Sequence, residues 1–354
     1  MKKINVILAG FAVLSLAVSC NGFLGSIGVK APGVDVKIDR QSEVAFVRVA
    51  DLDGNSHVKT ATDGELYIEK EAKEPVKATT SLTSGKNTIS GKLTIDGSDL
   101  PSVAKPVDGE LVNAGVIVTV ENPAPDPVEF DGTLVIDDKS GDIPSDKMIV
   151  PEGDVKSFGL LKEEKTDLHT QLGYEDPIIL PESFSDPISD GIDEIVIKDM
   201  SVTPKKGSKA PAAAETYEFT VKAKYYSSLS YKPGAKVHID KTFDDLGILI
   251  DVDDIFKEYD IYFDIESTVP FDIKFSASSP DGLTGTSEDV VKAGEPGKPV
   301  KSSIVLHVVD NSGKKVNAIS TATLSLDLTA GQNSKFAKGQ TLKIDTSKLT
   351  IVKL

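Results

Sequence analysis

Three residue types that would point to particular functions are scarce or missing. Tryptophan is absent from the 354 residues, cysteine occurs once, and arginine occurs only as Arg40 and Arg48. Without tryptophan, the aromatic platform that commonly stacks sugar rings is less expected, although eight tyrosines could serve that role. A single cysteine cannot form a disulfide bond within the chain. Scarce arginine and a formal charge of −16 argue against nucleic acid as a partner, because clustered Lys and Arg bind phosphate backbones.

Motifs that indicate enzymes are also missing. The sequence holds no GxSxG, no GxxxxGK[ST] and no GxGxxG after an expected strand. The four histidines are far apart and form neither HExxH nor HxH, so we interpret each as an isolated surface or strand residue: His57, His169, His238 and His307. We therefore expect no catalytic residue, no cofactor and no metal, and a protein that is not an enzyme.

The first nineteen residues have the pattern of a secretory signal peptide. Lys2 and Lys3 precede a mostly apolar run over 4–18, and the small residue Ser19 stands just before Cys20. A charged start, a short apolar run and a small residue at the cleavage point are typical of exported proteins. The run is too short for a membrane span with ordinary flanks.

The stretch LSLAVSC resembles the signal of bacterial lipoproteins, in which the cysteine is acylated and becomes the mature N-terminus. Ala17 stands where that family usually has Leu, a variation familiar in Bacteroidetes. The resemblance implies lipid attachment at Cys20, the membrane as partner, and an outer-membrane location. NGFLGS after the cysteine lacks the acidic residues of the surface-export signal, so the periplasmic and cell-surface faces both remain open. The alternative is an ordinary secreted protein with a stray cysteine.

Residues 20–33 indicate a flexible, lipidated tether. Residues 21–33 hold four glycines and one proline without an apolar period, and such a chain spans ~20 Å on average. Removing residues 1–19 leaves a charge of −18 (−16 minus 2), which disfavours docking of the body on anionic lipid.

Alternating apolar and polar residues predict an all-β chain. Such alternation is typical of half-buried strands, and Gly, Pro, Asp and Ser separate the runs. We expect strands at 34–39, 43–51, 92–96, 115–122, 128–137, 217–225 and 320–329. Only 156–173 predicts a helix, through Leu161, Leu168 and Leu172 with Gly173 as its stop, and 253–260 is a weaker candidate.

The segment TPKKGSKAPAAAE predicts a linker at 203–215. It would divide a first β-sandwich region, 34–202, from a second β-sandwich domain, 216–354. Across it, VTVENPAPDPVEF (118–130) aligns without gaps on FDIESTVPFDIKF (263–275), and IVIKDMSV (195–202) matches LKIDTSKLTIV (342–352). These matches indicate a duplicated sandwich. We expect KLTIVKL at the end to pair into the second domain.

Residues 34–85 lie outside this repeat. They resemble hairpins of prealbumin-like and other Ig-like bacterial surface modules, with turns at DGN and TDG. They could form a small separate module, but about fifty residues make a marginal core, so we favour attachment to the neighbouring sandwich. The fold class expected is tandem Ig-like or prealbumin-like β-sandwiches after a lipoprotein signal peptide.

Two acidic stretches are candidate cation sites. In DLDGN, Asp51, Asp53 and Asn55 offer oxygens at alternate positions, with Asp63 and Glu65 as further candidates, as calcium prefers. Asp-Gly is also a common hairpin turn, and we favour that interpretation. The second stretch, Asp244, Asp245, Asp251, Asp253 and Asp254, is interpreted as a solvated rim around a strand.

These observations favour a non-enzymatic envelope lipoprotein that serves binding, adhesion or assembly, with an envelope protein or a glycan as partner. It resembles the β-rich lipoproteins of Bacteroidetes. One alternative is a pilus subunit of the fimbrillin kind, which also begins as a lipoprotein and is matured by cleavage after an arginine. Arg40, just before the first strong strand, would be that arginine. A second alternative is a glycan-processing accessory protein.

Overall fold

The computed structural model of the chain describes residues 41–45, 57–163, 171–174, 176–205, 215–243, 248–249, 258–280, 282–311, 318–319 and 321–353. These residues form two compact units. The N-terminal unit comprises the described residues from 57 to 230. The C-terminal unit comprises 41–45 together with those from 231 onward.

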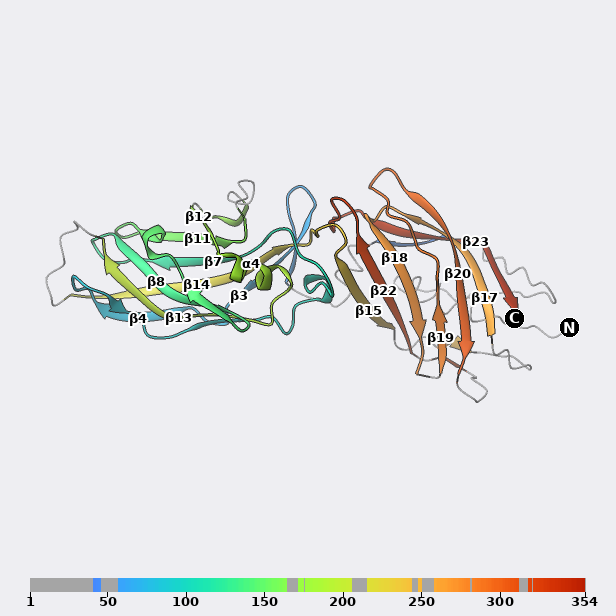
Figure 1. Cartoon of the computed structure of the whole chain (residues 1–354), viewed down its shortest axis with the longest axis horizontal. Coiled ribbons are helices and arrows are strands. Elements are labelled where there is room, and N and C mark those ends of the chain that lie inside the picture. The colour runs from blue at the N-terminus through green and yellow to red at the C-terminus, as the bar shows by residue number, and fades with distance from the viewer. Residues whose placement is uncertain are drawn as a thin grey trace. The chain divides into compact units, whose positions relative to one another are not determined.

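Both units are almost entirely β (Figure 1), which confirms the all-β sandwich prediction. The strands of the N-terminal unit are β2 (Val58–Thr60), β3 (Leu66–Glu71), β4 (Val76–Ser81), β5 (Asn87–Thr88), β6 (Leu93–Asp96), β7 (Ala114–Glu121), β8 (Val128–Ile136), β9 (Lys139–Asp142), β10 (Ile149–Val150), β11 (Val155–Leu161), β12 (Asp176–Ile179), β13 (Glu194–Pro204) and β14 (Thr216–Ser228). Its described helical residues are α4 (Glu182–Ser189), residues 171–172, and two 3-10 turns, Ser102–Ala104 and Ser145–Lys147.

The C-terminal unit has its own set of strands. They are β1 (Gln41–Ala45), β15 (Lys236–Phe243), β16 (Ile248–Leu249), β17 (Glu258–Ser267), β18 (Phe271–Ser278), β19 (Leu283–Thr286), β20 (Val300–Asp310), β21 (Ala318–Ile319), β22 (Ala322–Ala330) and β23 (Thr341–Lys353).

The strand order in each unit is that of a jelly roll. In the C-terminal unit the order is β1-β23-β17-β20-β19-β18-β22-β15. We number the eight strands of this sheet along the chain, leaving out the separate pair β16 and β21. Strands one, eight, three and six then form one layer, and strands five, four, seven and two form the other. In an Ig domain the last strand pairs with the one before it. Here β22 and β23 pair with different partners, so the Ig-like or prealbumin-like connectivity that we expected is replaced by the jelly-roll order.

The N-terminal unit repeats this order. One layer is β11-β7-β14, with β3 and β4 end to end along the far edge of β14, and the other is formed by β6, β13, β8 and β9. The strands β4, β6, β7, β8, β9, β11, β13 and β14 therefore correspond to β1, β15, β17, β18, β19, β20, β22 and β23. The inward residues of the strands form the core, as in β8, where every second residue is buried.

The duplication is confirmed by the strand pairings and by one shared turn. Asn122 and Ser267 occupy matching places after β7 and β17, and both are fully buried. The side-chain oxygen of Asn122 accepts a hydrogen bond from the backbone N–H of Ala124 at 3.0 Å, and that of Ser267 accepts one from Val269 at 3.1 Å. In each unit this turn carries the chain from one layer to the other. The predicted match between IVIKDMSV and LKIDTSKLTIV is wrong. The first lies in β13, which corresponds to β22, and the second lies in β23, which corresponds to β14.

The domain boundary lies away from the predicted linker. The strand β14, which follows that linker, pairs with β3, β4 and β7, so it belongs to the N-terminal unit. The units divide between Ser230 and Tyr231. The Pro- and Lys-rich composition at 203–215 therefore marks a connection within one jelly roll, between β13 and β14, and its residues 206–214 lie outside the described part.

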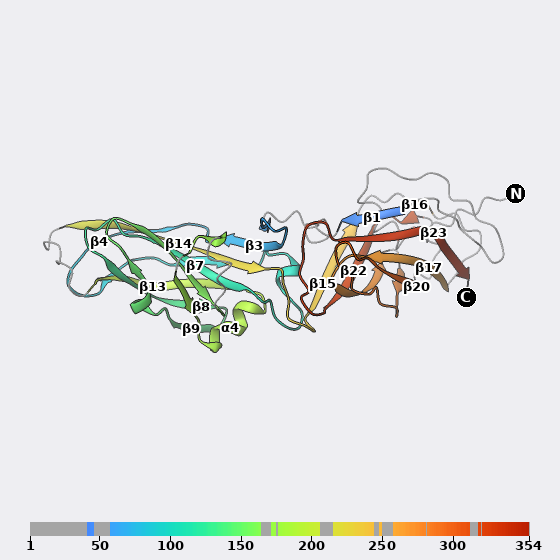
Figure 2. The ribbon, with the colours of Figure 1, turned by 90° about the horizontal axis from the view of Figure 1, so that it is seen from above.

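The segment 34–85 is divided between the two units. The strand β1 pairs with β23, from Gln41 opposite Asp345 to Ala45 opposite Thr341, and the two lie side by side in Figure 2. By contrast, β3 and β4 join the N-terminal unit, as predicted for this segment. The N-terminal jelly roll is thus inserted between the first and second strands of the C-terminal one. The end of the chain also pairs as predicted, since Lys353 lies opposite Tyr259 of β17.

The helix predicted over 156–173 is confirmed only near its end, where residues 171–172 are helical and Gly173 follows in the left-handed region (φ 71°). Residues 164–170 of that prediction, and 253–257 of the weaker one, lie outside the described residues. The other described parts of both predictions hold strands. Residues 155–161 form β11, where Phe158 and Leu160 alternate into the core and pair across to β7. Residues 258–260 begin β17. The spacing of the leucines fits a helix, but pairing with β7 overrides this local preference. The short helix α4 was missed because Pro187 lies inside it and proline normally argues against a helix interior.

Candidate functional site

The candidate functional site lies at an interruption in the first strand of the N-terminal jelly roll. Glu71, the last residue of β3, lies opposite Lys224 of β14, whereas Val76, the first residue of β4, lies opposite Val221. Four residues, 72–75, therefore face only two, 222–223. Such an extra length on one strand is a β-bulge, a feature that occurs next to binding and active sites. We call residues 72–75 the bulge.

The sequence explains why the strand is interrupted here. The bulge reads Ala-Lys-Glu-Pro, and Pro75 has no N–H to donate to the ladder. The N–H of Ala72 keeps one bond to the carbonyl of Ala223, at 2.9 Å. A proline within an otherwise alternating run was the signal in the sequence for this site, and sequence reasoning missed it.

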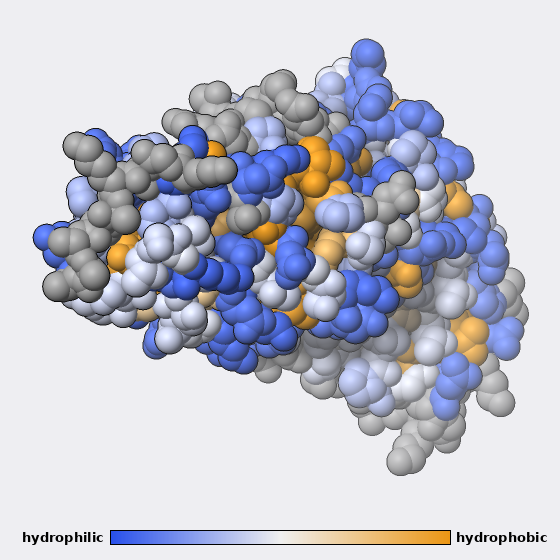
Figure 3. All heavy atoms as spheres, turned by 60° about the vertical axis from the view of Figure 1, so that its left-hand side comes forward, coloured by the Kyte–Doolittle hydropathy of each residue, from blue (hydrophilic) through white to orange (hydrophobic). Residues whose placement is uncertain are grey.

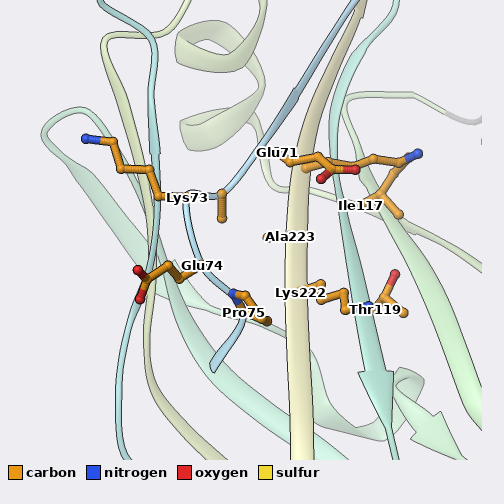
Figure 4. A pocket seen from close by; sticks show the side chains of 10 residues that line it. Glu71, Lys73, Glu74, Pro75, Ile117, Thr119, Lys222 and Ala223 are labelled. Carbon is orange, nitrogen blue, oxygen red and sulfur yellow. The ribbon is translucent and has the colours of Figure 1, made fainter. Parts of the chain in front are cut away.

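A pocket of about 410 Å³ opens beside the bulge, on the outer face of the β3-β14-β7 layer. Figure 4 shows Glu71, Ile117, Thr119 and Lys222 on one side of β14, while Lys73 and Glu74 extend from the bulge away from that strand. The complete lining is Glu71, Ala72, Lys73, Glu74, Pro75, Ile117, Thr119, Lys222, Ala223 and Lys224. Its aliphatic and charged groups alternate, and no aromatic ring takes part.

Some charged groups of the pocket are already paired and others are not. The ammonium group of Lys224 contacts the Glu69 carboxylate at 3.0 Å, and the hydroxyls of Thr119 and Ser157 are hydrogen-bonded at 2.8 Å. Lys73, Lys222, Glu71 and Glu74 have no side-chain hydrogen bond or ion pair within the described residues. Beside Ile117 and Thr119, the pocket therefore offers one free carboxylate, Glu71, and one free ammonium group, Lys222, while Lys73 and Glu74 extend away from β14.

An apolar cluster borders the pocket on the same outer face. Ile117 belongs to both, and it packs with Leu161, Leu172, Tyr174 and Tyr226, with Tyr67 against them. The rings of Tyr67 and Tyr226 are 5.4 Å apart. Burial, and secondarily the charge of Glu69, raises the pKa of Tyr67. This cluster gives the β11-β7-β14 layer a second apolar contact outside the core, so one wall of the pocket is firmly held.

Most residues proposed from the sequence lie elsewhere. Cys20, Arg40, the DLDGN loop and the acidic stretch 244–254, except for residues 248 and 249, fall outside the described residues. Asp63, offered as a further calcium ligand, instead accepts a hydrogen bond from the backbone N–H of Glu65 at 3.0 Å. With Gly64 in the left-handed region (φ 89°), this is the TDG turn that the sequence predicts between β2 and β3.

Each described histidine lies beside an aspartate. His57 is 3.4 Å from Asp99, which also pairs with Lys70, and His307 is 2.9 Å from Asp260. His238 lies between two carboxylates, at 2.6 Å from Asp327 and 3.0 Å from Asp240, on the outer face of β15 and β22. The hydrogen bond that Asp327 accepts from the His238 ring, and then the one that Asp240 accepts, raises the pKa of His238. His169 lies outside the described residues.

Within the described ranges, no group of three or more His, Cys, Asp or Glu side chains is arranged to hold a metal ion. A search of the same residues for a long, apolar helix that could cross a membrane found none. On the face shown in Figure 3, hydrophilic side chains cover most of the surface and hydrophobic ones show between them in small areas.

Comparisons with known proteins yielded structural similarities only. No protein-family model matches the chain, and no curated protein matches it. Among solved structures, the chain is similar to a protein of Parabacteroides distasonis described as secreted, with 14% identity, a TM-score of 0.48, and coverage of 88% of this chain and 96% of that one. It is also similar to a protein in the structure of infectious bursal disease virus Gx strain, with 8% identity, a TM-score of 0.25, and coverage of 89% of this chain and 49% of that one, so it spans about half of that protein.

Proposed function

We propose that the protein is a non-enzymatic lipoprotein of the cell envelope, anchored at the outer membrane through an acylated Cys20, and that its N-terminal jelly roll binds a ligand. The observation that carries this proposal is the pocket beside the bulge, which presents unpaired charged groups on an outer sheet face. Binding without catalysis fits an open site that offers hydrogen-bonding groups and no assembled acid-base pair.

The order of the strands along the chain supports an anchor on one unit and the pocket on the other. Twenty residues, 21–40, separate Cys20 from β1 in the sequence. Because β1 belongs to the C-terminal unit, an anchor at Cys20 would tether that unit directly. The N-terminal unit, which carries the pocket, follows β1 in the sequence.

Metabolic labelling with palmitate tests the anchor. Wild-type protein should be labelled and should fractionate with membranes, and globomycin should block its processing. Cys20→Ser should abolish the label, whereas the control Ser19→Ala, which keeps a small residue at the cleavage point, should retain it. An unlabelled wild-type protein, processed normally in globomycin, would contradict the proposal.

A pilus subunit of the fimbrillin kind is the second candidate, favoured by one observation. Within the described residues, the strand β1 comprises Gln41–Ala45, directly after Arg40 in the sequence, and stands at one end of the strand order, paired with β23. Cleavage after Arg40 would separate this unit from its lipid and leave β1 at the new N-terminus. Mass spectrometry of the mature protein distinguishes the two functions: an acylated Cys20 supports the anchored binding protein, and a start at Gln41 that is lost in Arg40→Lys supports the subunit.

A further inference from the structure

We infer that the pocket beside the bulge is a binding site for an uncharged oligosaccharide. This inference rests on the proposed binding function and adds the class of ligand. It is argued from the balance of charge, the kinds of group that line the pocket, and its size.

The charge of the pocket argues against a strongly charged ligand. Lys224 is paired with Glu69, so the free charged groups beside Ile117 and Thr119 are Lys222 and Glu71, which sum to zero. A phosphate or polyanion would find no excess of positive charge here. It would also be repelled by a chain with a formal charge of −16.

The lining suits a polyhydroxylated molecule. A carboxylate only accepts hydrogen bonds and an ammonium group only donates them, so Glu71 and Lys222 together satisfy hydroxyls, which do both. The aliphatic groups of Pro75, which is exposed, and Ala72, which is half-buried, offer an apolar surface for the C–H face of a sugar ring. This surface takes the place of the aromatic ring that the pocket lacks.

The form of the site also favours a saccharide over an extended peptide. A volume of about 410 Å³ lies in the range of small-molecule pockets and has room for more than one sugar ring. A peptide that added a strand to the sheet would need a free edge. At this point the edge of β14 is occupied, because Ala72 already donates its N–H to Ala223.

Calorimetric titration of the mature full-length protein in detergent tests the inference. Maltotriose, cellotriose, mannotriose and galactotriose are titrated separately at about 10 mM, above the weak Kd of about 1 mM expected of an open site. At least one should bind. Its affinity should not change between about 0.02 and about 0.5 M salt, because an uncharged ligand is not screened. Trigalacturonate and hexa-alanine serve as an acidic saccharide and a peptide for comparison.

Variants locate the site and separate this inference from the proposed function. Glu71→Gln and Lys222→Met should each weaken binding about tenfold, the loss expected for a hydrogen bond to a charged group. The control Lys92→Met, an exposed lysine of the same unit outside the pocket, should bind as wild type. The inference would be overturned if none of the four sugars binds, or if sugar binding is unaffected by both pocket variants. It would also be overturned if only trigalacturonate binds, in a salt-dependent way, or if only hexa-alanine binds. Palmitate labelling of Cys20 is measured separately, so a negative result with the sugars would refute the ligand class without refuting the lipid anchor.

Discussion

Replacement of Asn122 by alanine should selectively destabilise the N-terminal jelly roll. Asn122 is fully buried where the chain passes from β7 to β8. Its amide nitrogen donates to the carbonyls of Asp126 at 2.9 Å, Val150 at 3.3 Å and Pro151 at 2.9 Å. Its oxygen accepts from the N–H of Ala124 at 3.0 Å. One side chain therefore satisfies four backbone groups.

The expected cost follows from these bonds. A hydrogen bond contributes about 1 kcal/mol net, and a buried backbone group left unsatisfied costs about 1–3 kcal/mol. The two N–H groups of the Asn122 amide are shared among three carbonyls, and a carbonyl tolerates partial loss of its hydrogen bonds. We therefore expect Asn122→Ala to lower the free energy of unfolding by about 3 kcal/mol. In the other unit, the hydroxyl of the matching residue, Ser267, is hydrogen-bonded among the described residues only to the backbone of Val269, at 3.1 and 3.5 Å, so Ser267→Ala should cost about 1 kcal/mol.

Urea unfolding followed by tyrosine fluorescence measures the loss of free energy, and hydrogen exchange read by mass spectrometry assigns it to a unit. Faster exchange should be confined to the N-terminal unit in Asn122→Ala and to the C-terminal unit in Ser267→Ala. The control Asn311→Ala removes an exposed amide that bonds only to Thr284 and should change stability by less than about 0.5 kcal/mol. The reasoning is refuted when Asn122→Ala costs no more than Ser267→Ala.

Three further predictions follow from the packing, the titration and the topology. Gly159→Ala should lose about 1–3 kcal/mol of unfolding free energy in urea, because its new Cβ would lie 2.8 Å from the Tyr174 ring, whereas the control Gly85→Ala, with open space around it, should not be destabilised. His238 should titrate by NMR above its ordinary pKa of about 6.5, and Asp327→Asn should lower that value; a pKa unchanged by the variant would contradict the assigned cause. Since its folded pKa is raised, the small stabilisation from His238 is complete below pH 6.5 and is lost as the pH rises through the folded value, so the urea midpoint should fall slightly over that interval in wild type but not in His238→Gln. An expressed fragment of residues 55–230 should show a cooperative unfolding transition. A fragment of residues 216–354 should not, because it lacks β1 and carries β14 without its partners. A cooperative transition in the second fragment would refute the assigned boundary.

The sequence by itself determined the features that depend on neighbouring residues. Alternation at 128–136 predicts β8, because successive side chains of a strand point to opposite faces. The gapless match of 118–130 to 263–275 predicts the duplication, because the same local turn at Asn122 and Ser267 carries the chain between layers in both units.

Only the tertiary structure decided which strands pair. The leucines at 161 and 172 fit one helix locally, but hydrogen bonding of 155–161 to β7 places Leu161 in a strand, and only Leu172 is helical. The two leucines meet in a cluster on the outer face. The residues at 203–215 have the composition of a linker, yet β13 and β14 on either side of them belong to one jelly roll. The strand β1 precedes the N-terminal unit but completes the other, and the pocket exists because four residues of one strand face two of β14. Pairings between distant residues depend on the packing of the whole unit, which no short stretch of sequence encodes.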